Sequence, residues 1–145
     1  MLVRCLYASR PRMPKPANIV DEILVQSRRN NQRTGITGLL CFTNDIFLQV
    51  IEGGRDEVCE LFNAIVRDER HEGVRLLVYE EIEERCFSGW TMGQVKVQSV
   101  NAALLLKYSK RAELNPFVMS GGATMALLKE MLASGAIVSR GGTQP

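Results

Sequence analysis

The chain of 145 residues has a single histidine, His71, and only four cysteines, which are scattered along its length. No two of the cysteines have Cys-x-x-Cys spacing, which argues against a zinc site and against a disulfide framework. One histidine cannot supply a two-histidine metal site. We therefore expect no bound metal and a cytoplasmic protein with reduced thiols. These thiols are Cys5, Cys41, Cys59 and Cys86.

The sequence also lacks a long apolar run and a strong charge of either sign. No segment approaches the roughly 20 apolar residues of a membrane span, and Arg4 interrupts the apolar start, so neither a membrane anchor nor a signal peptide is predicted. The net charge of +2 is too small to indicate a nucleic-acid partner, although residues 96–145 hold six basic and two acidic side chains. With 46% hydrophobic and 23% charged residues, the composition is typical of one globular domain.

Hydrophobic periodicity predicts five strands and two helices in the first two-thirds of the chain. Alternation from Leu2 to Ser9 predicts the first strand, and the other strands are expected at 36–42, 46–52, 74–79 and 90–97. The first helix is expected to start after Asn18 as its N-cap and to end near Asn30 and Asn31. The second is expected to follow Gly53-Gly54, because apolar residues recur there at helical spacing.

The order strand, helix, strand, strand, helix, strand, strand predicts an α+β domain with a ferredoxin-like sheet and two helices on one face. Residues 102–133 contain two further apolar segments, separated by Ser120-Gly121-Gly122, and are expected to form helices that cover the other face. We therefore expect a sheet domain over residues 1–97, C-terminal capping helices over 98–138 and a flexible, frayed tail over 139–145.

Two polar side chains fall where the alternation predicts a buried face. Gln49 shares a strand face with Phe47 and Ile51, and Tyr7 points toward the same layer if that face lies under the helices. A buried amide needs partners, because an unsatisfied one costs about 1–3 kcal/mol. With Asn30-Asn31 nearby, these groups predict a cleft between the helices that suits a planar heteroaromatic ligand. Its apolar lining is expected from Ile19, Ile23, Val58, Phe62 and Ile65.

Each of these residues also has a purely structural interpretation. Tyr7 is then a core residue, Gln49 bonds to the backbone of a neighbouring strand, and Asn30-Asn31 cap the first helix. Four later residues are then packing residues or a solvated helix end, namely Trp90, Met92, Arg70 and His71. Periodicity alone therefore predicts only an α+β domain that binds a ligand.

Taken together, the segments resemble the BLUF family, flavin-binding domains that sense blue light. The matching pieces occur in order and span residues 1 to about 97 without an obvious gap. They are Tyr7-Ala8-Ser9, Ser27 to Asn31, Gly35 to Leu40, Phe47 to Gly53, Asp68 to His71 and Phe87 to Met92. No single piece is specific, but the ordered set is.

The resemblance implies a non-covalently bound FAD, or another flavin, whose ring lies between the two helices. Tyr7 then matches the photoactive tyrosine, Gln49 the glutamine that hydrogen-bonds the flavin, and Asn31 the amide at the carbonyl edge of the ring. The other cofactor-binding residues are expected at Ile23, Ser27, Asn30, Phe62, Asp68, Arg70 and His71. Ala64 stands where some relatives have a basic side chain, so the resemblance does not assign the phosphate contacts.

The resemblance further implies a photoreceptor and not an enzyme. Light-driven transfer of an electron and a proton from Tyr7 then rearranges the hydrogen bonds of Gln49, by rotation or by tautomerisation of its amide. The expected product is a slightly red-shifted, still oxidised flavin that recovers in the dark. Trp90 and Met92 match relay residues. The signal is expected to leave through the fifth strand and residues 102–133 toward an unidentified protein partner or a second copy in a homodimer.

Two other functions share this order of elements. An RRM-like RNA-binding module suits the slightly basic pI of 8.4, but the exposed aromatic platform that stacks bases on the central strands is missing. A small acylphosphatase-like hydrolase needs a basic loop and an asparagine around one phosphate-sized site, and that arrangement is not evident. Both functions stay open as alternatives to the photoreceptor.

Overall fold

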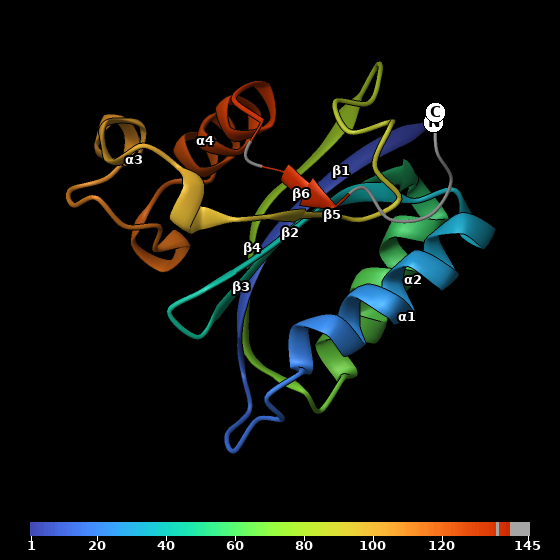
Figure 1. Ribbon diagram of the computed structural model, residues 1–145. Coiled ribbons are helices and arrows are strands. Elements are labelled where there is room, and N and C mark those ends of the chain that lie inside the picture. The colour runs from blue at the N-terminus through green and yellow to red at the C-terminus, as the bar shows by residue number, and fades with distance from the viewer. Residues whose placement is uncertain (136, 140–145) are drawn as a thin grey trace.

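The computed structural model describes residues 1–135 and 137–139. Within these residues a six-stranded sheet separates two helical layers (Figure 1). The strands are β1 (Leu2–Pro11), β2 (Thr37–Thr43), β3 (Ile46–Gly54), β4 (His71–Ile82), β5 (Gly93–Val95) and β6 (Ile137–Ser139), in the order β4-β1-β3-β2-β5-β6. One layer holds α1 (Ile19–Thr34) and α2 (Arg55–Arg67), and the other holds α3 (Ala102–Tyr108) and α4 (Gly121–Ala133). The predicted ferredoxin-like α+β fold, with helices on both faces, is confirmed.

The central strands β1 and β3 run antiparallel, and their alternation sorts side chains between the two layers. Odd-numbered residues such as Val3 and Phe47 pack in the core under α1 and α2, while even-numbered residues such as Leu6 and Val50 pack under α3 and α4. Tyr7 lies directly opposite Gln49 in this register and shares the α1 and α2 side. The predicted layer for both polar residues is therefore confirmed.

The ends of several elements differ from the prediction. Helix α1 runs one turn past Asn30 and Asn31 and ends at Gly35, whose φ of 77° gives the left-handed C-cap that glycine adopts most easily. The strand expected at 90–97 is reduced to β5, because the three residues before Gly93 make hydrogen bonds outside the sheet ladder. The hairpin between β2 and β3 was predicted correctly, and positive φ values of 51° and 55° at Asn44 and Asp45 fit its two-residue turn.

The C-terminal segment covers the second face of the sheet with short helices. A 3-10 turn (Val97–Ser99) precedes α3, and another (Pro116–Val118) precedes α4. Ser120, predicted to break the segment, is the N-cap of α4, because its Oγ accepts a hydrogen bond from the Ala123 amide at 3.0 Å. None of the described helices is long and apolar enough to cross a bilayer.

The last strand, β6, was not predicted. It pairs antiparallel with β5, and Ser139, expected to begin the frayed tail, lies opposite Gln94. Three residues are too few to show an alternating pattern, and the pairing depends on the open edge of β5, which no local signal reveals. The rest of the expected tail, residues 140–145, lies outside the described residues.

Candidate functional site

A cavity of about 310 Å³ lies between α1, α2 and the sheet. Its floor is formed by the β1 and β3 residues that alternation directs toward this layer, and its walls by one face of each helix. The lining residues are Tyr7, Ile23, Gln26, Ser27, Asn30, Asn31, Gln49, Leu61, Ala64, Ile65, Arg67, Asp68, Arg70 and His71. Four of these residues are apolar, Ile23, Leu61, Ala64 and Ile65, and the others bring polar or charged groups, so the cavity is more polar than the sequence predicts, while its volume is within the range of small-molecule sites.

Tyr7 and Gln49 are bonded to each other at the floor of the cavity. The Tyr7 hydroxyl donates a hydrogen bond to Gln49 Oε1, and both side chains are buried. Gln49 Nε2 lies 3.4 Å from the sulfur of Met92, which is also buried. Burial raises the pKa of the Tyr7 phenol well above its ordinary value, so this group is a neutral hydrogen-bond donor near neutral pH.

The ring of Tyr7 is fixed by Phe62, which meets it edge-on at a centroid distance of 5.7 Å. Phe62 does not line the cavity, and neither do Ile19 and Val58, which are buried in the core cluster on this side of the sheet, so the expectation that these three form part of the apolar lining was wrong. The other residues expected around the cofactor do line it. The position of Phe62 on the buried face of α2 makes it a support for the Tyr7 ring.

Asn31 connects α1 to the segment before β5. Its Nδ2 donates a hydrogen bond to the Thr91 carbonyl oxygen at 2.9 Å, and the side chain also lines the cavity. Arg28, one turn earlier on α1, donates from Nε to the Met92 carbonyl at 3.1 Å. Helix α1 therefore holds the backbone beside Gln49 as well as one wall of the cavity.

The α2–β4 connection supplies a charged end of the cavity. Arg70 pairs with Asp68 at 2.7 Å and donates to Gln26 Oε1 at 2.6 Å. Burial alone would raise the pKa of Asp68, but the hydrogen bonds and charge of Arg70 outweigh burial and lower it. Arg67, in the last turn of α2, lines the same cavity one helical turn beyond Ala64.

His71 is buried as the first residue of β4, so its interpretation as a solvated helix end was wrong. Its Nδ1 lies 2.8 Å from Ser9 Oγ, and its ring packs against Phe47 at 4.9 Å between centroids. The sequence predicts a solvated helix end at Arg70-His71, because the pairing of His71 with Pro11 in the β1–β4 ladder is a long-range contact that no local pattern reveals.

The burial of His71 predicts a pH dependence of stability. Burial lowers the pKa of this imidazole below its ordinary value of 6.5; the nearby Asp68 opposes the shift, and Arg70 adds to it. The unfolded chain therefore binds the additional proton first as the pH falls, and the free energy of unfolding should decrease below about pH 6.5, levelling off below the folded-state pKa. Urea unfolding from about pH 7 to about pH 5 should show this loss in the original protein and not in His71→Asn. If the free energy of unfolding changed equally with pH in the two proteins, His71 would not be the cause of the pH dependence.

Trp90 and Met92, the two expected relay residues, lie on opposite sides of the sheet. Met92 packs under α1 and α2 against Gln49, whereas the Trp90 side chain packs against the core cluster on the α3 and α4 side. Trp90 does not line the cavity. Its carbonyl oxygen accepts a hydrogen bond from the Gly38 amide at 2.8 Å.

Comparison with known proteins identifies the family. Residues 2–93 match BLUF, described as sensors of blue-light using FAD. The chain belongs to the BLUF family. It is 30% identical over 87 residues to the blue light- and temperature-regulated antirepressor BluF of Escherichia coli (strain K12), a match that covers 60% of this chain and 22% of that protein. The chain thus spans about a fifth of the length of that relative.

Two solved BLUF structures resemble the chain over nearly its whole length. The photo-activated state of BlsA has a TM-score of 0.82 at 27% identity and covers 99% of this chain and 100% of its own. The dark-state structure of BlrB has a TM-score of 0.75 at 33% identity, with coverage of 92% and 96%. BLUF membership makes the chain a blue-light sensor that uses FAD, and favours this function over RNA binding and acyl-phosphate hydrolysis.

The residues of the cavity fit the flavin ring of FAD. Ile23 and Ile65 supply apolar walls, and the amides of Asn31 and Gln49 supply the hydrogen-bonding groups that a heterocycle with carbonyl and ring-nitrogen edges needs. Sequence reasoning missed Gln26, Leu61 and Arg67. Leu61 lies three residues before Ala64 on α2 and Arg67 three residues after it, so the helical period could have indicated both.

Proposed function

We propose that Tyr7 and Gln49 are the photoactive pair of this blue-light sensor. The observation that carries the proposal is the buried hydrogen bond from the Tyr7 hydroxyl to Gln49 Oε1 at the floor of the cavity. When bound, the flavin supplies the absorption of blue light and, once excited, a strong electron acceptor. With the flavin bound, Tyr7 would supply the electron that the excited ring accepts, its Oη proton would move along the hydrogen bond toward Gln49 Oε1, and both would return to Tyr7.

Gln49 keeps an altered arrangement of hydrogen bonds after Tyr7 has recovered its electron and proton. Its amide has an acceptor end, which Tyr7 uses, and a donor end, which contacts only a weakly accepting sulfur on Met92. Rotation or tautomerisation of the amide presents different groups to Tyr7, Met92 and the cofactor without breaking a covalent bond. Because only hydrogen bonds change, the altered state is expected to revert thermally in the dark.

The cavity walls bind and orient the cofactor. Asn31 holds the carbonyl edge of the ring with Asn30, Ser27 and Ile23 beside it, and the Asp68 and Arg70 pair closes the charged end together with His71. For the diphosphate we propose Arg67 as a positive contact in place of the basic residue absent at Ala64, because Arg67 lies one turn away in the same cavity lining.

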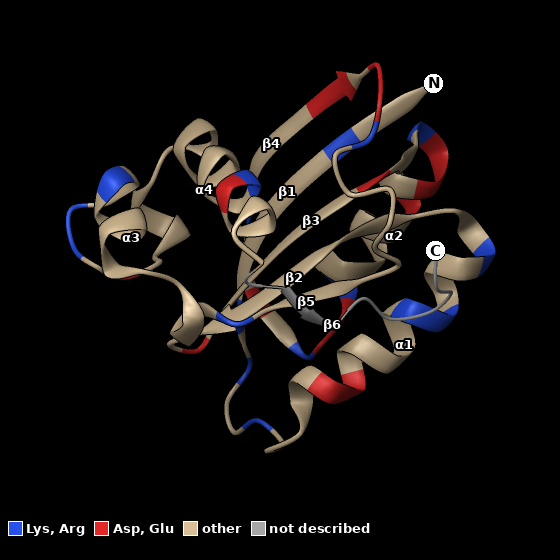
Figure 2. Ribbon diagram, turned by 45° about the horizontal axis from the view of Figure 1, so that its top comes forward, with Lys and Arg blue, Asp and Glu red and all other residues tan. Residues whose placement is uncertain are grey.

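The output is proposed to pass to a protein partner through the layer of α3 and α4. Leu106 and Val118 in this layer are 53% and 80% exposed, so each offers apolar surface to a partner. Figure 2 shows basic residues on α3 and in the loop that follows it, and these are Lys107, Lys110 and Arg111. An exposed apolar and basic surface suits a protein partner, or the same surface of a second copy.

Absorption spectroscopy tests the photoreceptor directly. The purified protein should be yellow with bound FAD, and blue light should move its flavin bands reversibly to slightly longer wavelength, because only hydrogen bonds at the ring edge change. The bands should return in the dark without added reductant or oxidant. A protein that stays colourless after incubation with FAD, or one whose bands bleach instead of shifting, would contradict the proposal.

A further inference from the structure

The segment that joins β4 to β5 connects the two helical layers. Residues 85–92, here called the bridge segment, begin on the α3 and α4 side, where Phe87 is fully buried in the core cluster that includes Leu105 and Leu128. The segment then passes the start of β2, with the Trp90 carbonyl bonded to the Gly38 amide, and ends at Met92 beside Gln49. One short stretch of chain therefore contacts the core on both faces of the sheet.

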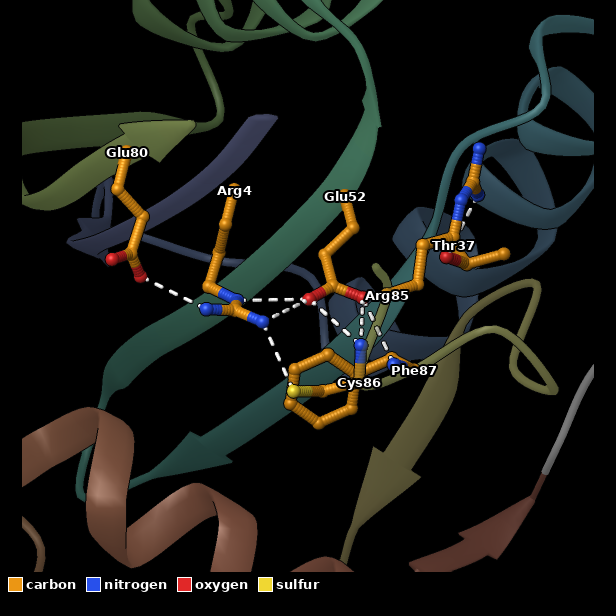
Figure 3. Close-up of polar contacts among 7 residues, drawn as sticks. All are labelled: Arg4, Thr37, Glu52, Glu80, Arg85, Cys86 and Phe87. Atoms are coloured by element: carbon orange, nitrogen blue, oxygen red, sulfur yellow. Dashed lines mark hydrogen bonds and ion pairs between the residues drawn. The ribbon is translucent and has the colours of Figure 1, made fainter. Parts of the chain in front are cut away.

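The Phe87 end of the bridge segment is held by a buried carboxylate. Figure 3 shows Glu52 of β3 pointing at the segment, where its Oε1 accepts hydrogen bonds from the backbone amides of Cys86 at 3.0 Å and Phe87 at 2.9 Å. Arg85 adds a contact to the Gly35 carbonyl at 2.6 Å. The side chain of Glu52 has no exposed surface, so all of its contacts are internal.

The charge of Glu52 is balanced by Arg4, its direct neighbour on β1. The guanidinium lies 2.8 Å from Glu52 Oε2, and its Nη1 donates to Glu80 at 2.9 Å on β4. Burial lowers the pKa of Arg4, but the bonds to Glu80 and Glu52 outweigh it, so the net pKa is raised. A buried ion pair contributes little net stability compared with apolar residues of similar size, so the stability of the fold does not by itself explain why Arg4 and Glu52 are buried here.

Both ends of the bridge segment are thus fixed to a single strand. Gln49 and Glu52 are three residues apart on β3 and point to opposite faces, so Gln49 meets the Met92 end and Glu52 meets the Phe87 end. Charge-assisted bonds to two consecutive amides are stronger than neutral ones and fix a loop in one position. If Met92 is displaced, a segment held at Phe87 transmits the displacement to Trp90 and to the core under α3 and α4. A segment without this anchor would change its own backbone conformation instead, and the core would not move.

We propose that Glu52 is a positioning residue for signal output, because it holds the Phe87 end of the bridge segment so that a change at Gln49 reaches α3 and α4. This inference rests on the proposed photoreceptor function. It assigns Glu52 and Arg4 no contact with the cofactor and no part in the photochemistry. A substitution of Glu52 should therefore leave the flavin band shift unchanged and reduce the response of α3 and α4 to light.

The test uses the full chain with FAD bound and three measurements on each protein: the flavin band shift, hydrogen exchange of residues 102–133 in the dark and in the light, and the midpoint of urea unfolding. Glu52→Gln is the first variant, because an amide cannot accept from both the Arg4 guanidinium and the two backbone amides. The double variant Arg4→Met with Glu52→Leu is the second; it removes both charges together and so leaves no uncompensated buried charge if the single variant fails to fold. Glu81→Gln is the matched control, since its carboxylate pairs with Arg55 at 2.6 Å on the exposed side of β4.

The original protein and Glu81→Gln should show both the band shift and a light-dependent change in exchange over residues 102–133. The Glu52 variants should keep the band shift, but the light-dependent difference in hydrogen exchange over residues 102–133 should be at least about fivefold smaller than in the original protein. A factor of about five is the lower end of the usual range of coupling between two sites. A purely structural role would lower the unfolding midpoint and leave the exchange change at full size, which would overturn the inference. A band shift in the original protein without any exchange change would also overturn it. Absence of the band shift in the original protein would instead reject the photoreceptor proposal, and the same sample distinguishes these results.

Discussion

Replacing Tyr7 with phenylalanine is expected to leave a yellow protein whose flavin bands no longer shift in blue light. The substitution removes one oxygen and keeps the ring that packs edge-on against Phe62. The lost hydroxyl leaves Gln49 Oε1 without its donor, so a loss of about 1–3 kcal/mol in the free energy of unfolding is also expected. Absorption spectra before and after illumination measure the first effect, and urea unfolding measures the second.

Tyr79→Phe is the matched control for this experiment. Tyr79 lies on β4, is 44% exposed, and its hydroxyl contacts Cys59 at 3.7 Å, away from the cavity lining. Removing that hydroxyl should leave the band shift at full size. A normal shift in Tyr7→Phe, with FAD bound, would contradict the role of Tyr7 as the electron and proton donor, whereas a colourless Tyr7→Phe protein would show that the hydroxyl is needed for binding.

Replacing Gly38 with alanine is expected to produce the largest loss of stability among single small substitutions in the sheet. A Cβ at this position would overlap the backbone carbonyl oxygen of Val50 on the neighbouring strand. Backbone atoms cannot rotate away as a side chain can, so β2 must shift, at a cost of about 3 kcal/mol. The shift would also strain the hydrogen bond from the Gly38 amide to the Trp90 carbonyl, which is 2.8 Å long.

Gly122→Ala provides the control for this substitution. Gly122 lies in the first turn of α4, and no heavy atom would come within 4 Å of an added Cβ. Alanine should raise the free energy of unfolding there by about 0.5 kcal/mol, because it restricts the unfolded chain and favours the helix. Urea unfolding of the two variants should therefore give changes of opposite sign. A Gly38→Ala protein as stable as the original would show that β2 and β3 separate more easily than their register indicates.

Strand periodicity predicted the centre of the site because the deciding pattern is local. Alternation along β1 and β3 put Tyr7 and Gln49 on one face, and a hairpin turn with Asn44 and Asp45 fixed the direction of β3 relative to β2. The direct opposition of Tyr7 and Gln49 follows from the β1–β3 register, which local patterns do not determine. The roles of the cofactor-binding residues came from family resemblance and stay predictions until a ligand-bound protein is tested.

Long-range contacts account for the features that the sequence concealed. The sequence indicates no partner for Arg4 or Glu52, and only the β1–β3 pairing reveals that each neutralises the other under the second helical layer. His71 likewise reads as part of a charged, solvated turn until β4 pairs with β1. Periodicity can place a polar residue on a buried face, as it does for Gln49, but it does not identify a hydrogen-bond or charge partner far away in the sequence.

The position of Trp90 has a practical consequence for spectroscopy. It is the chain's sole tryptophan, and its indole packs with the core beneath α3 and α4 while the cavity lies across the sheet. Intrinsic emission from the indole therefore reports on a single location, next to the proposed output layer, and needs no attached dye. Among the described residues that line the cavity there is no tryptophan, so the proposed electron donor Tyr7 does not share this cavity wall with the easily oxidised indole.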